Sequence, residues 1–131
     1  MPSVPWRWLS KAVVLAIQAE QLAEHGGAAG LRDEAGLDSA LARPKNLAAY
    51  ADPDAAALAA TYAFGIVRGH PFVDGNRRTG VVTAATFLLL NGFELTASEQ
   101  DVTTTFWRLA GGALSEGELA RWFRDCIQPI E

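Results

Sequence analysis

The apolar run TGVVTAATFLLLNGF, residues 79–93, constrains the fold of this chain most strongly. After Gly80 almost every residue in it is apolar, so a helix built from it would be apolar nearly all round. The run is shorter than the about 20 residues that a membrane-spanning helix needs. Asn91 followed by Gly92 is a typical helix C-terminal signal. We therefore expect a central, buried helix that begins near Asn76 and ends at these two residues.

Signals that start and stop helices also divide the rest of the chain, and sustained alternation of apolar and polar residues is absent. One start is an Asp-Pro-Asp sequence, in which we expect Asp52 to be the cap and Pro53 the first helical residue. A second helix should end near Arg43, because Pro44 follows. The expected helices span Ser10 to about Glu24, Leu37 to about Arg43, Asp52 to about Arg68, Asn76 to Asn91, Glu99 to Ala110, and a last one from the capping box Ser115–Glu118 onward.

Little of the chain is left over for strands. Residues 93–97, FELTA, could form a short extended piece, and residues 45–52, KNLAAYAD, are expected to be an irregular connection. The prediction is an all-α fold, a compact bundle of about six helices, in which a central helix is the buried one.

Composition narrows the classes of function. The 131 residues, of which 50% are hydrophobic, suit one domain spanning residues 1–131. The formal charge of −4 and the lack of a long basic run count against direct binding to nucleic acid. The N-terminus lacks the order of a signal peptide, and no run is long enough to span a membrane. The single cysteine, Cys126, cannot form an internal disulfide and suits a reducing compartment. We expect a cytoplasmic protein without a membrane partner.

The stretch RGHPFVDGNRRTG, residues 68–80, gathers polar groups where a loop meets the predicted central helix. Asn76, Arg77 and Arg78 fall on the first turn of that helix, where free backbone N–H groups and the helix dipole favour anions. The two arginines add fork-shaped donors that suit phosphate oxygens. Gly75 lets the backbone approach a ligand closely. The pattern predicts a phosphate-binding site.

Two further residues of the stretch suggest chemistry at that site. Asp74 would repel a bound polyphosphate unless a divalent cation lay between them, and Mg²⁺ is commonly held by one carboxylate and substrate phosphates. His70 is a suitable general base near neutral pH. Asn76 could position a phosphate or hold the shape of the loop. The combination points to phosphoryl-type transfer to a hydroxyl.

Each of these residues also has a purely structural interpretation. The His70 ring could cap the preceding helix, Asp74 could be the N-cap of the next helix with no metal, and the two arginines could form a solvated face. Taken together, so many polar groups at one helix start favour a ligand site. Outside the stretch, we expect Trp107 and Trp122 in or at the edge of the core, Trp6 and Trp8 either packed on the bundle or awaiting a partner, His25 at a helix C-terminus, Arg32 with Asp33 in a salt bridge or a substrate contact, and Cys126 without a catalytic role.

The sequence HPFVDGNRRTG resembles the signature of the Fic/Doc family, His-x-Phe-x-Asp/Glu-Gly/Ala-Asn-Gly/Lys-Arg, and FLLLNGF and LAGGALSEGELARWFRD are similar to short Doc proteins. The resemblance covers nearly the whole chain. It implies a compact helical fold and the toxin half of a bacterial toxin–antitoxin pair, with a Phd-like antitoxin as partner.

The resemblance also implies roles for individual residues. Arg77 stands where Doc proteins have lysine and AMP-transferring Fic proteins have glycine, and Val81 stands where the latter have another arginine. Both features favour transfer of the γ-phosphate of ATP to a threonine of elongation factor Tu, which halts translation. By the same resemblance, His70 matches the catalytic base, Phe72 the anchor of the loop, Asp74 the Mg²⁺ ligand, Asn76 the phosphate-positioning asparagine, and Arg78 the arginine that contacts nucleotide phosphates, with Gly75 and Arg77 in the phosphate-binding turn.

Three alternatives stay open. A Fic-type AMP transferase would use the same base and metal but would move the α-phosphate and release pyrophosphate. A ribonuclease toxin would use His70 and the arginines on RNA, although the acidic charge counts against it. A catalytically inactive relative would only bind an antitoxin.

Overall fold

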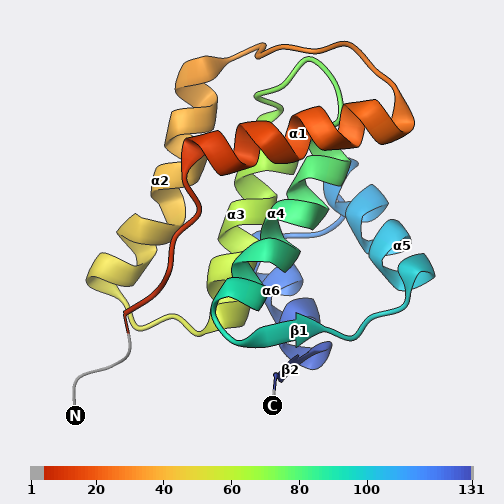
Figure 1. The fold of residues 1–131 in the computed structure, drawn as a ribbon. Coiled ribbons are helices and arrows are strands. Elements are labelled where there is room, and N and C mark those ends of the chain that lie inside the picture. Colours follow the sequence, from red (N-terminus) through yellow and green to blue (C-terminus); the bar gives the residue numbers. More distant parts are fainter. Residues whose placement is uncertain (1–4, 131) are drawn as a thin grey trace.

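The computed structural model describes residues 5–130, and within that range the chain forms six helices and two short strands (Figure 1). The all-α prediction is confirmed. The elements are α1 (Lys11–His25), α2 (Glu34–Tyr50), α3 (Ala55–Gly69), α4 (Asn76–Leu90), β1 (Phe93–Leu95), α5 (Glu99–Ala110), α6 (Glu116–Asp125) and β2 (Ile127–Pro129). None of the described helices is both long and apolar enough to cross a membrane.

Local capping signals place several helix ends where the sequence predicts them. The Ser10 hydroxyl accepts a hydrogen bond from the Val13 backbone N–H at the start of α1. At the start of α6, Ser115 and Glu118 form the expected reciprocal capping box, in which each side chain accepts from the other residue's backbone N–H. These bonds satisfy backbone donors that have no partner inside the helix.

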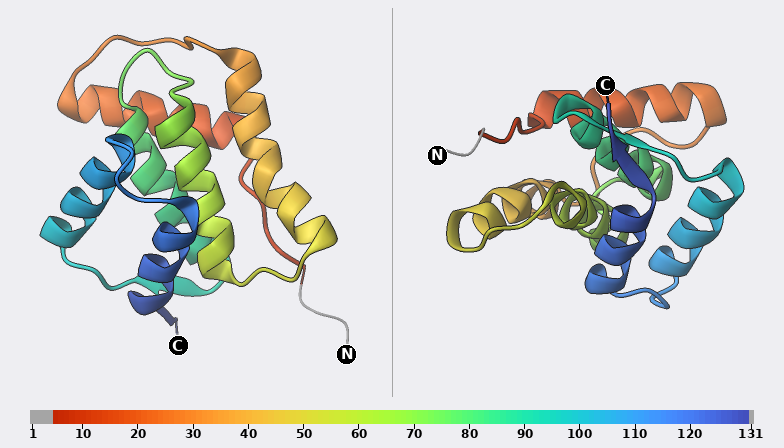
Figure 2. Two further views of the ribbon diagram at one scale, coloured as in Figure 1. Left: turned by 180° about the vertical axis from the view of Figure 1, so that it is seen from behind. Right: turned by 90° about the horizontal axis from the view of Figure 1, so that it is seen from below.

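The helix α3 is the centre of the bundle. It contacts α2, α4, α5 and α6, and ten of its residues are buried. Figures 1 and 2 show α2 and α6 beside α3, with α1 crossing one end of the bundle near α4. The predicted central helix, α4, is packed between α1, α3 and α5, but Leu89 and Leu90 near its end are 56% and 43% exposed. The prediction that α4 is buried nearly all round was therefore too strong, because its C-terminal end is exposed.

The helix α2 contradicts the expectation that the chain leaves the helix ahead of Pro44. The helix continues to Tyr50, with Pro44 buried inside it, so the predicted irregular connection is mostly helical. A proline costs about 3 kcal/mol in a helix interior. Packing against α3 outweighs this cost: a Cβ placed on Gly65 would lie 3.0 Å from the Ala40 Cβ, so small residues let the two helices approach closely.

The start of α3 is also shifted from its predicted position. Asp54, and not Asp52, is the N-cap, and its carboxylate accepts a hydrogen bond from the Ala57 N–H at 2.9 Å. Pro53 therefore lies outside the helix. The Asp54 carboxylate also binds Arg124 of α6, a contact that no local pattern could reveal.

The short extended piece is confirmed as β1, and its partner β2 was missed. The two strands pair antiparallel, with Phe93 opposite Pro129 and Leu95 opposite Ile127. A strand of three residues is too short for an alternating pattern to be recognised. Near the other end of the chain, the Trp6 and Trp8 rings pack against Phe87 at centroid distances of 6.1 and 5.9 Å, so both tryptophans belong to the bundle.

The connections α1–α2 and α3–α4 meet at one end of the bundle (Figure 1). The Val73 N–H donates to the Gly30 carbonyl at 3.0 Å, and a single β-bridge joins Leu31 to Phe72. The loop that carries the motif is thus supported by a second loop rather than projecting freely.

Candidate active site

His70 ends α3 in an unusual backbone conformation. It is the C-cap residue, with φ 55° and ψ 49°, and among residues 5–130 it is the only non-glycine residue with a positive φ. A left-handed conformation costs an ordinary residue about 1–2 kcal/mol, and such strain persists only where the surroundings hold it. The His70 backbone N–H donates to the Ile66 carbonyl, whereas Nδ1 of its ring lies beside the Asn76 side chain. The ring does not cap α3.

Arg32 holds this strained corner in place. Its Nε donates to the His70 carbonyl at 2.7 Å and its Nη2 to the Gly69 carbonyl at 3.1 Å. These are carbonyls at the negative end of the α3 dipole, where a cation is favourable. Asp33 instead caps α2 by accepting from the Gly36 N–H. Within residues 5–130 neither residue forms the expected salt bridge, whereas the other expected role, a substrate contact, stays a prediction.

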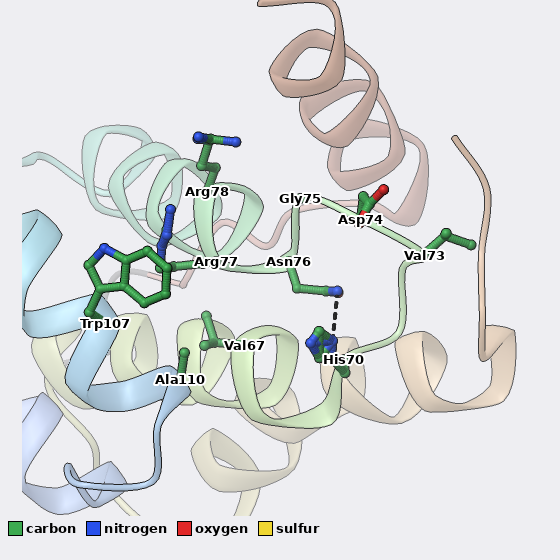
Figure 3. Close-up of a pocket in the computed structure, with 10 residues that line it drawn as sticks. All are labelled: Val67, His70, Val73, Asp74, Gly75, Asn76, Arg77, Arg78, Trp107 and Ala110. Atoms are coloured by element: carbon green, nitrogen blue, oxygen red, sulfur yellow. Dashed lines mark hydrogen bonds between the residues drawn. The ribbon is translucent and has the colours of Figure 1, made fainter. Parts of the chain in front are cut away.

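Asn76 holds the inside of the loop. It is 4% exposed, and its Oδ1 accepts from the Phe72 N–H at 3.0 Å while its Nδ2 donates to the Phe72 carbonyl at 3.0 Å. The same Nδ2 lies 2.9 Å from Nδ1 of His70 (Figure 3). Phe72 itself is fully buried in the core, as its expected anchoring role requires. In this arrangement Asn76 shapes the loop and orients the His70 ring.

Asp74 does not cap α4. The N-cap is Gly75, which has φ 79° and makes no side-chain cap hydrogen bond, so the first N–H groups of α4 stay available for an anion. The exposed Asp74 carboxylate accepts from the Ala28 N–H at 2.7 Å through Oδ2. One of its oxygens therefore ties the two loops together.

Arg77 and Arg78 lie on the first turn of α4 but point in different directions. The Arg77 guanidinium lies over the Trp107 ring of α5, 4.0 Å from the ring centroid, and Arg78 extends away from His70 (Figure 3). Burial, and then the neighbouring Arg78 charge, lower the pKa of Arg77, although arginine stays protonated in proteins. Trp107 is 60% exposed, so the prediction of a core position is wrong for it, because it faces the site and not the bundle interior.

All the predicted site residues line one pocket of about 250 Å³. The pattern placed them together correctly because they are contiguous in sequence. Two of the other lining residues, Trp107 and Ala110, come from α5. No local sequence signal determines how α5 packs against α4, so these two residues could not be predicted. The lining consists of Val67, His70, Val73, Asp74, Gly75, Asn76, Arg77, Arg78, Trp107 and Ala110 (Figure 3).

A second pocket of about 220 Å³ is also bordered by these two arginines. Arg77 and Arg78 border both pockets, which therefore adjoin at the first turn of α4. Each pocket alone is smaller than the about 300 Å³ at the lower end for a small-molecule site. The further lining of the second pocket is Gln21, His25, Val81, Val82, Glu99, Val102, Thr103 and Phe106.

The donor set suits Mg²⁺ only together with a substrate. Within residues 5–130 no three His, Cys, Asp or Glu residues gather as a metal site. In the first pocket Asp74 is the one carboxylate of the lining, beside two arginines that suit phosphates. Mg²⁺ keeps several waters and is often held by one carboxylate and substrate phosphates, so this site fits a nucleotide-bound Mg²⁺ and not a resident ion.

Two other side chains, His25 and Trp122, lie where the sequence predicts them, and a third, Cys126, is a poor nucleophile. His25 lies in the last turn of α1, where a cation is favourable at a helix C-terminus. Burial first, and then Asp125 and Asp101, raise the pKa of Cys126 to about 11, which disfavours a reactive thiolate. Trp122 was predicted in or at the edge of the core, and this is confirmed, because it is half-buried against Phe106 and Phe123.

A protein-family model described as the Fic/DOC family matches residues 8–88, more than half of the chain. The chain belongs to the Fic/Doc family. Over 90 residues it is 30% identical to "Protein kinase doc" of Escherichia phage P1, an alignment that covers 68% of this chain and 71% of that protein. Over 74 residues it is 40% identical to "Toxin Doc" of Mycolicibacterium smegmatis, covering 55% and 57% of the two chains.

The matched region of this Fic/Doc protein includes α1 to most of α4, and so the whole motif loop. It ends before α5. The Arg77–Trp107 contact thus joins the family motif to a part of the chain that the family model does not match.

Proposed function

We propose that this Fic/Doc protein is a Doc-type toxin that transfers the γ-phosphate of ATP to a protein hydroxyl, a threonine of elongation factor Tu, and thereby halts translation. Its partner would be a Phd-like antitoxin, and it would act in the cytoplasm. The names of the two relatives, a kinase and a toxin, support both parts of the proposal.

The observation that carries the proposal is the gathering of an imidazole, a carboxylate and two guanidinium groups around one pocket at a helix N-terminus. His70 can take a proton, whereas Arg77 and Arg78 can bind phosphate oxygens. The Gly75 backbone leaves the first N–H groups of α4 free of a side-chain cap. Anion binding and proton transfer are therefore available within one site, as phosphoryl transfer requires.

The second pocket supports γ- over α-phosphate transfer. Its apolar lining from α4 and α5 suits a nucleoside, and Val81 lies there in place of the arginine that AMP-transferring relatives carry. Along α4, Val81 is about 7.5 Å from Asn76, since a helix rises about 1.5 Å per residue. A nucleoside in the second pocket would thus place its terminal phosphate, and not its α-phosphate, next to His70. Arg77, packed on Trp107, borders both pockets.

In the proposed reaction, His70 takes the proton of the threonine hydroxyl while the hydroxyl oxygen bonds to the γ-phosphorus. The bond from that phosphorus to the β,γ-bridging oxygen breaks, and ADP leaves. The α4 N–H groups, Arg77 and Arg78 hold the phosphate oxygens in line. Asp74 would hold Mg²⁺ together with those oxygens, and the ion, when bound, would neutralise phosphate charge.

A transfer assay tests the proposal directly. The protein is incubated with Mg²⁺ and purified elongation factor Tu, in parallel with ATP labelled on the γ- or on the α-phosphate. We expect label on the factor only from γ-labelled ATP, and none with the His70→Ala variant. Label from the α position would establish AMP transfer instead. Absence of transfer from either position, with antitoxin binding retained, would identify an inactive relative.

A further inference from the structure

The side-chain amide of Asn76 has only one orientation that its surroundings accept. Phe72 presents a backbone N–H to one end of the amide and a carbonyl to the other, both at 3.0 Å. A flipped amide would set donor against donor and acceptor against acceptor, so the hydrogen-bond network itself assigns Oδ1 and Nδ2. Because Asn76 is 4% exposed, water cannot replace these bonds.

This orientation decides the role of the His70 ring. Nδ2 of Asn76 lies 2.9 Å from Nδ1 of His70, and an amide nitrogen can only donate. Nδ1 must therefore accept, and a neutral ring then carries its hydrogen on Nε2. In this tautomer Nδ1 is the only nitrogen able to take a proton, and it is the nitrogen that Asn76 covers.

We infer that Asn76 is a positioning residue that holds His70 in the Nε2–H tautomer and covers its basic nitrogen until a nucleotide phosphate draws the amide hydrogen away. This inference rests on the proposed use of His70 as a base. The inference accounts for both roles expected of Asn76, holding the loop and contacting a phosphate. Nδ1 of His70 and a phosphate oxygen would compete for the same hydrogen on Nδ2 of Asn76.

The count of hydrogens shows which bond a phosphate would replace. Nδ2 has two hydrogens, one used on the Phe72 carbonyl and one on His70. The Phe72 bond is one of a matched pair within the loop, whereas the His70 bond is single and reaches an exposed ring. A phosphate oxygen at the α4 N-terminus would therefore take the hydrogen from His70. Nδ1 would then be free to accept the hydroxyl proton, which gives an imidazolium with hydrogens on both nitrogens.

Nitrogen-15 NMR of the histidine rings tests the tautomer without any activity. The chain has two histidines, and His25 provides an internal reference because its exposed ring has no amide donor among its hydrogen bonds in the described part of the chain. The spectra are recorded at a pH where both rings are neutral. We expect the long-range couplings between the ring hydrogens and the two ring nitrogens of His70 to identify Nε2 as the nitrogen that carries the hydrogen. A His70 ring with its hydrogen on Nδ1, or with the same tautomer mixture as His25, would overturn the inference.

The second arm adds Mg²⁺ and a non-hydrolysable ATP analogue. We expect the His70 ring signals and the Asn76 side-chain amide signals to shift together as the bond between them breaks. If other signals show that the analogue binds but this pair does not change, the release step is wrong, although the proposed function stands. If the analogue does not bind at all, the proposed function fails, and the free-protein spectrum alone decides the tautomer.

The Asn76→Asp variant should reverse the tautomer of the His70 ring. A carboxylate can only accept, so the neutral His70 ring should move its hydrogen to Nδ1, whereas a merely structural role for Asn76 would leave the tautomer as it was. An unchanged Nε2–H tautomer in a folded variant would contradict the inference. The wild-type spectra keep the inference testable even if the new carboxylate, opposite the Phe72 carbonyl, prevents folding.

Discussion

The Arg77 guanidinium of α4 lies over the indole ring of Trp107 on α5, 4.0 Å from its centroid. The two residues are far apart in sequence, and each borders the pocket that contains His70. A cation over the face of a tryptophan is favourable, and the contact also restricts the arginine side chain. The indole therefore positions Arg77 where it borders both pockets.

Replacing Trp107 should reveal this contact. We expect Trp107→Leu, which keeps an apolar side chain without a π face, to lower the free energy of unfolding by about 0.5–1 kcal/mol. Trp107→Phe, which keeps a ring, should lose less. Urea unfolding of the three proteins measures the difference. Equal stability of the leucine and phenylalanine variants would mean that only apolar contact holds Arg77.

His70 is both the proposed general base and a residue with a strained backbone, and two variants distinguish the effects of the ring from those of the backbone. Both His70→Ala and His70→Gly remove the imidazole, so both should abolish phosphate transfer and growth arrest. The glycine variant should be the more stable by about 1 kcal/mol, because only glycine adopts the left-handed conformation without strain. Thermal unfolding of the two purified variants tests this order. Growth arrest by a folded alanine variant would remove the general-base assignment.

Asp74 should matter for metal-dependent nucleotide binding. Asp74→Asn keeps an oxygen that can accept from the Ala28 N–H but removes the charge that Mg²⁺ requires. We expect this variant to lose at least about tenfold in affinity for a Mg²⁺–ATP analogue, a change of about 1.4 kcal/mol, with little change in stability. Titration calorimetry with and without Mg²⁺ measures both affinities. Binding that ignores both the metal and the substitution would contradict the metal assignment.

The N-cap of α3 predicts a contrast between two neighbouring aspartates. Asp54→Ala should cost about 1 kcal/mol of stability through the lost cap, whereas Asp52→Ala should cost less than about 0.5 kcal/mol. Asp54→Asn keeps the cap and loses only the half-exposed ion pair with Arg124, worth about 0–1 kcal/mol. Urea unfolding at neutral pH tests this order, and equal effects of the two alanine variants would place the cap elsewhere.

The same ion pair contributes a pH dependence. The hydrogen bonds from Arg124 and then from the Ala57 N–H lower the pKa of Asp54 in the folded protein. A lowered folded-state pKa means that the stabilisation is complete above the unfolded value of about 3.9 and is lost as the pH falls through the folded value. The Asp54→Asn variant should therefore lose less stability than the wild type on acidification below about pH 4. Parallel acid titrations of the two proteins measure this.

Cys126 should be protected from alkylation while the protein is folded. Its Sγ donates to the Trp122 carbonyl, and burial is the main reason that its pKa rises to about 11. An unfolded cysteine has a pKa of about 8.5, so at pH 8 the folded thiol should react roughly 100-fold more slowly with iodoacetamide. Mass spectrometry in buffer and in urea measures the two rates. Similar rates would show that the thiol is freely exposed.

The sequence by itself determined the helical class, most of the helix ends and the grouping of the motif residues at one corner of the bundle. Caps such as Ser10 and the Ser115–Glu118 box act within one turn, so their signals are local and readable. The motif from His70 to Arg78 is contiguous, so any fold that joins two helices there brings its residues to one corner. The prediction of a phosphate-type pocket at this corner depends on nothing more distant.

Only the tertiary structure decided how that corner is held and closed. Arg32 reaches the strained His70 carbonyl from another loop, and Trp107 reaches Arg77 from another helix. The continuation of α2 through Pro44 likewise depends on a close packing partner in α3. Such contacts join residues more than a turn apart, and their free energy exists only once the helices have packed. A pattern confined to a few neighbouring residues therefore cannot contain them.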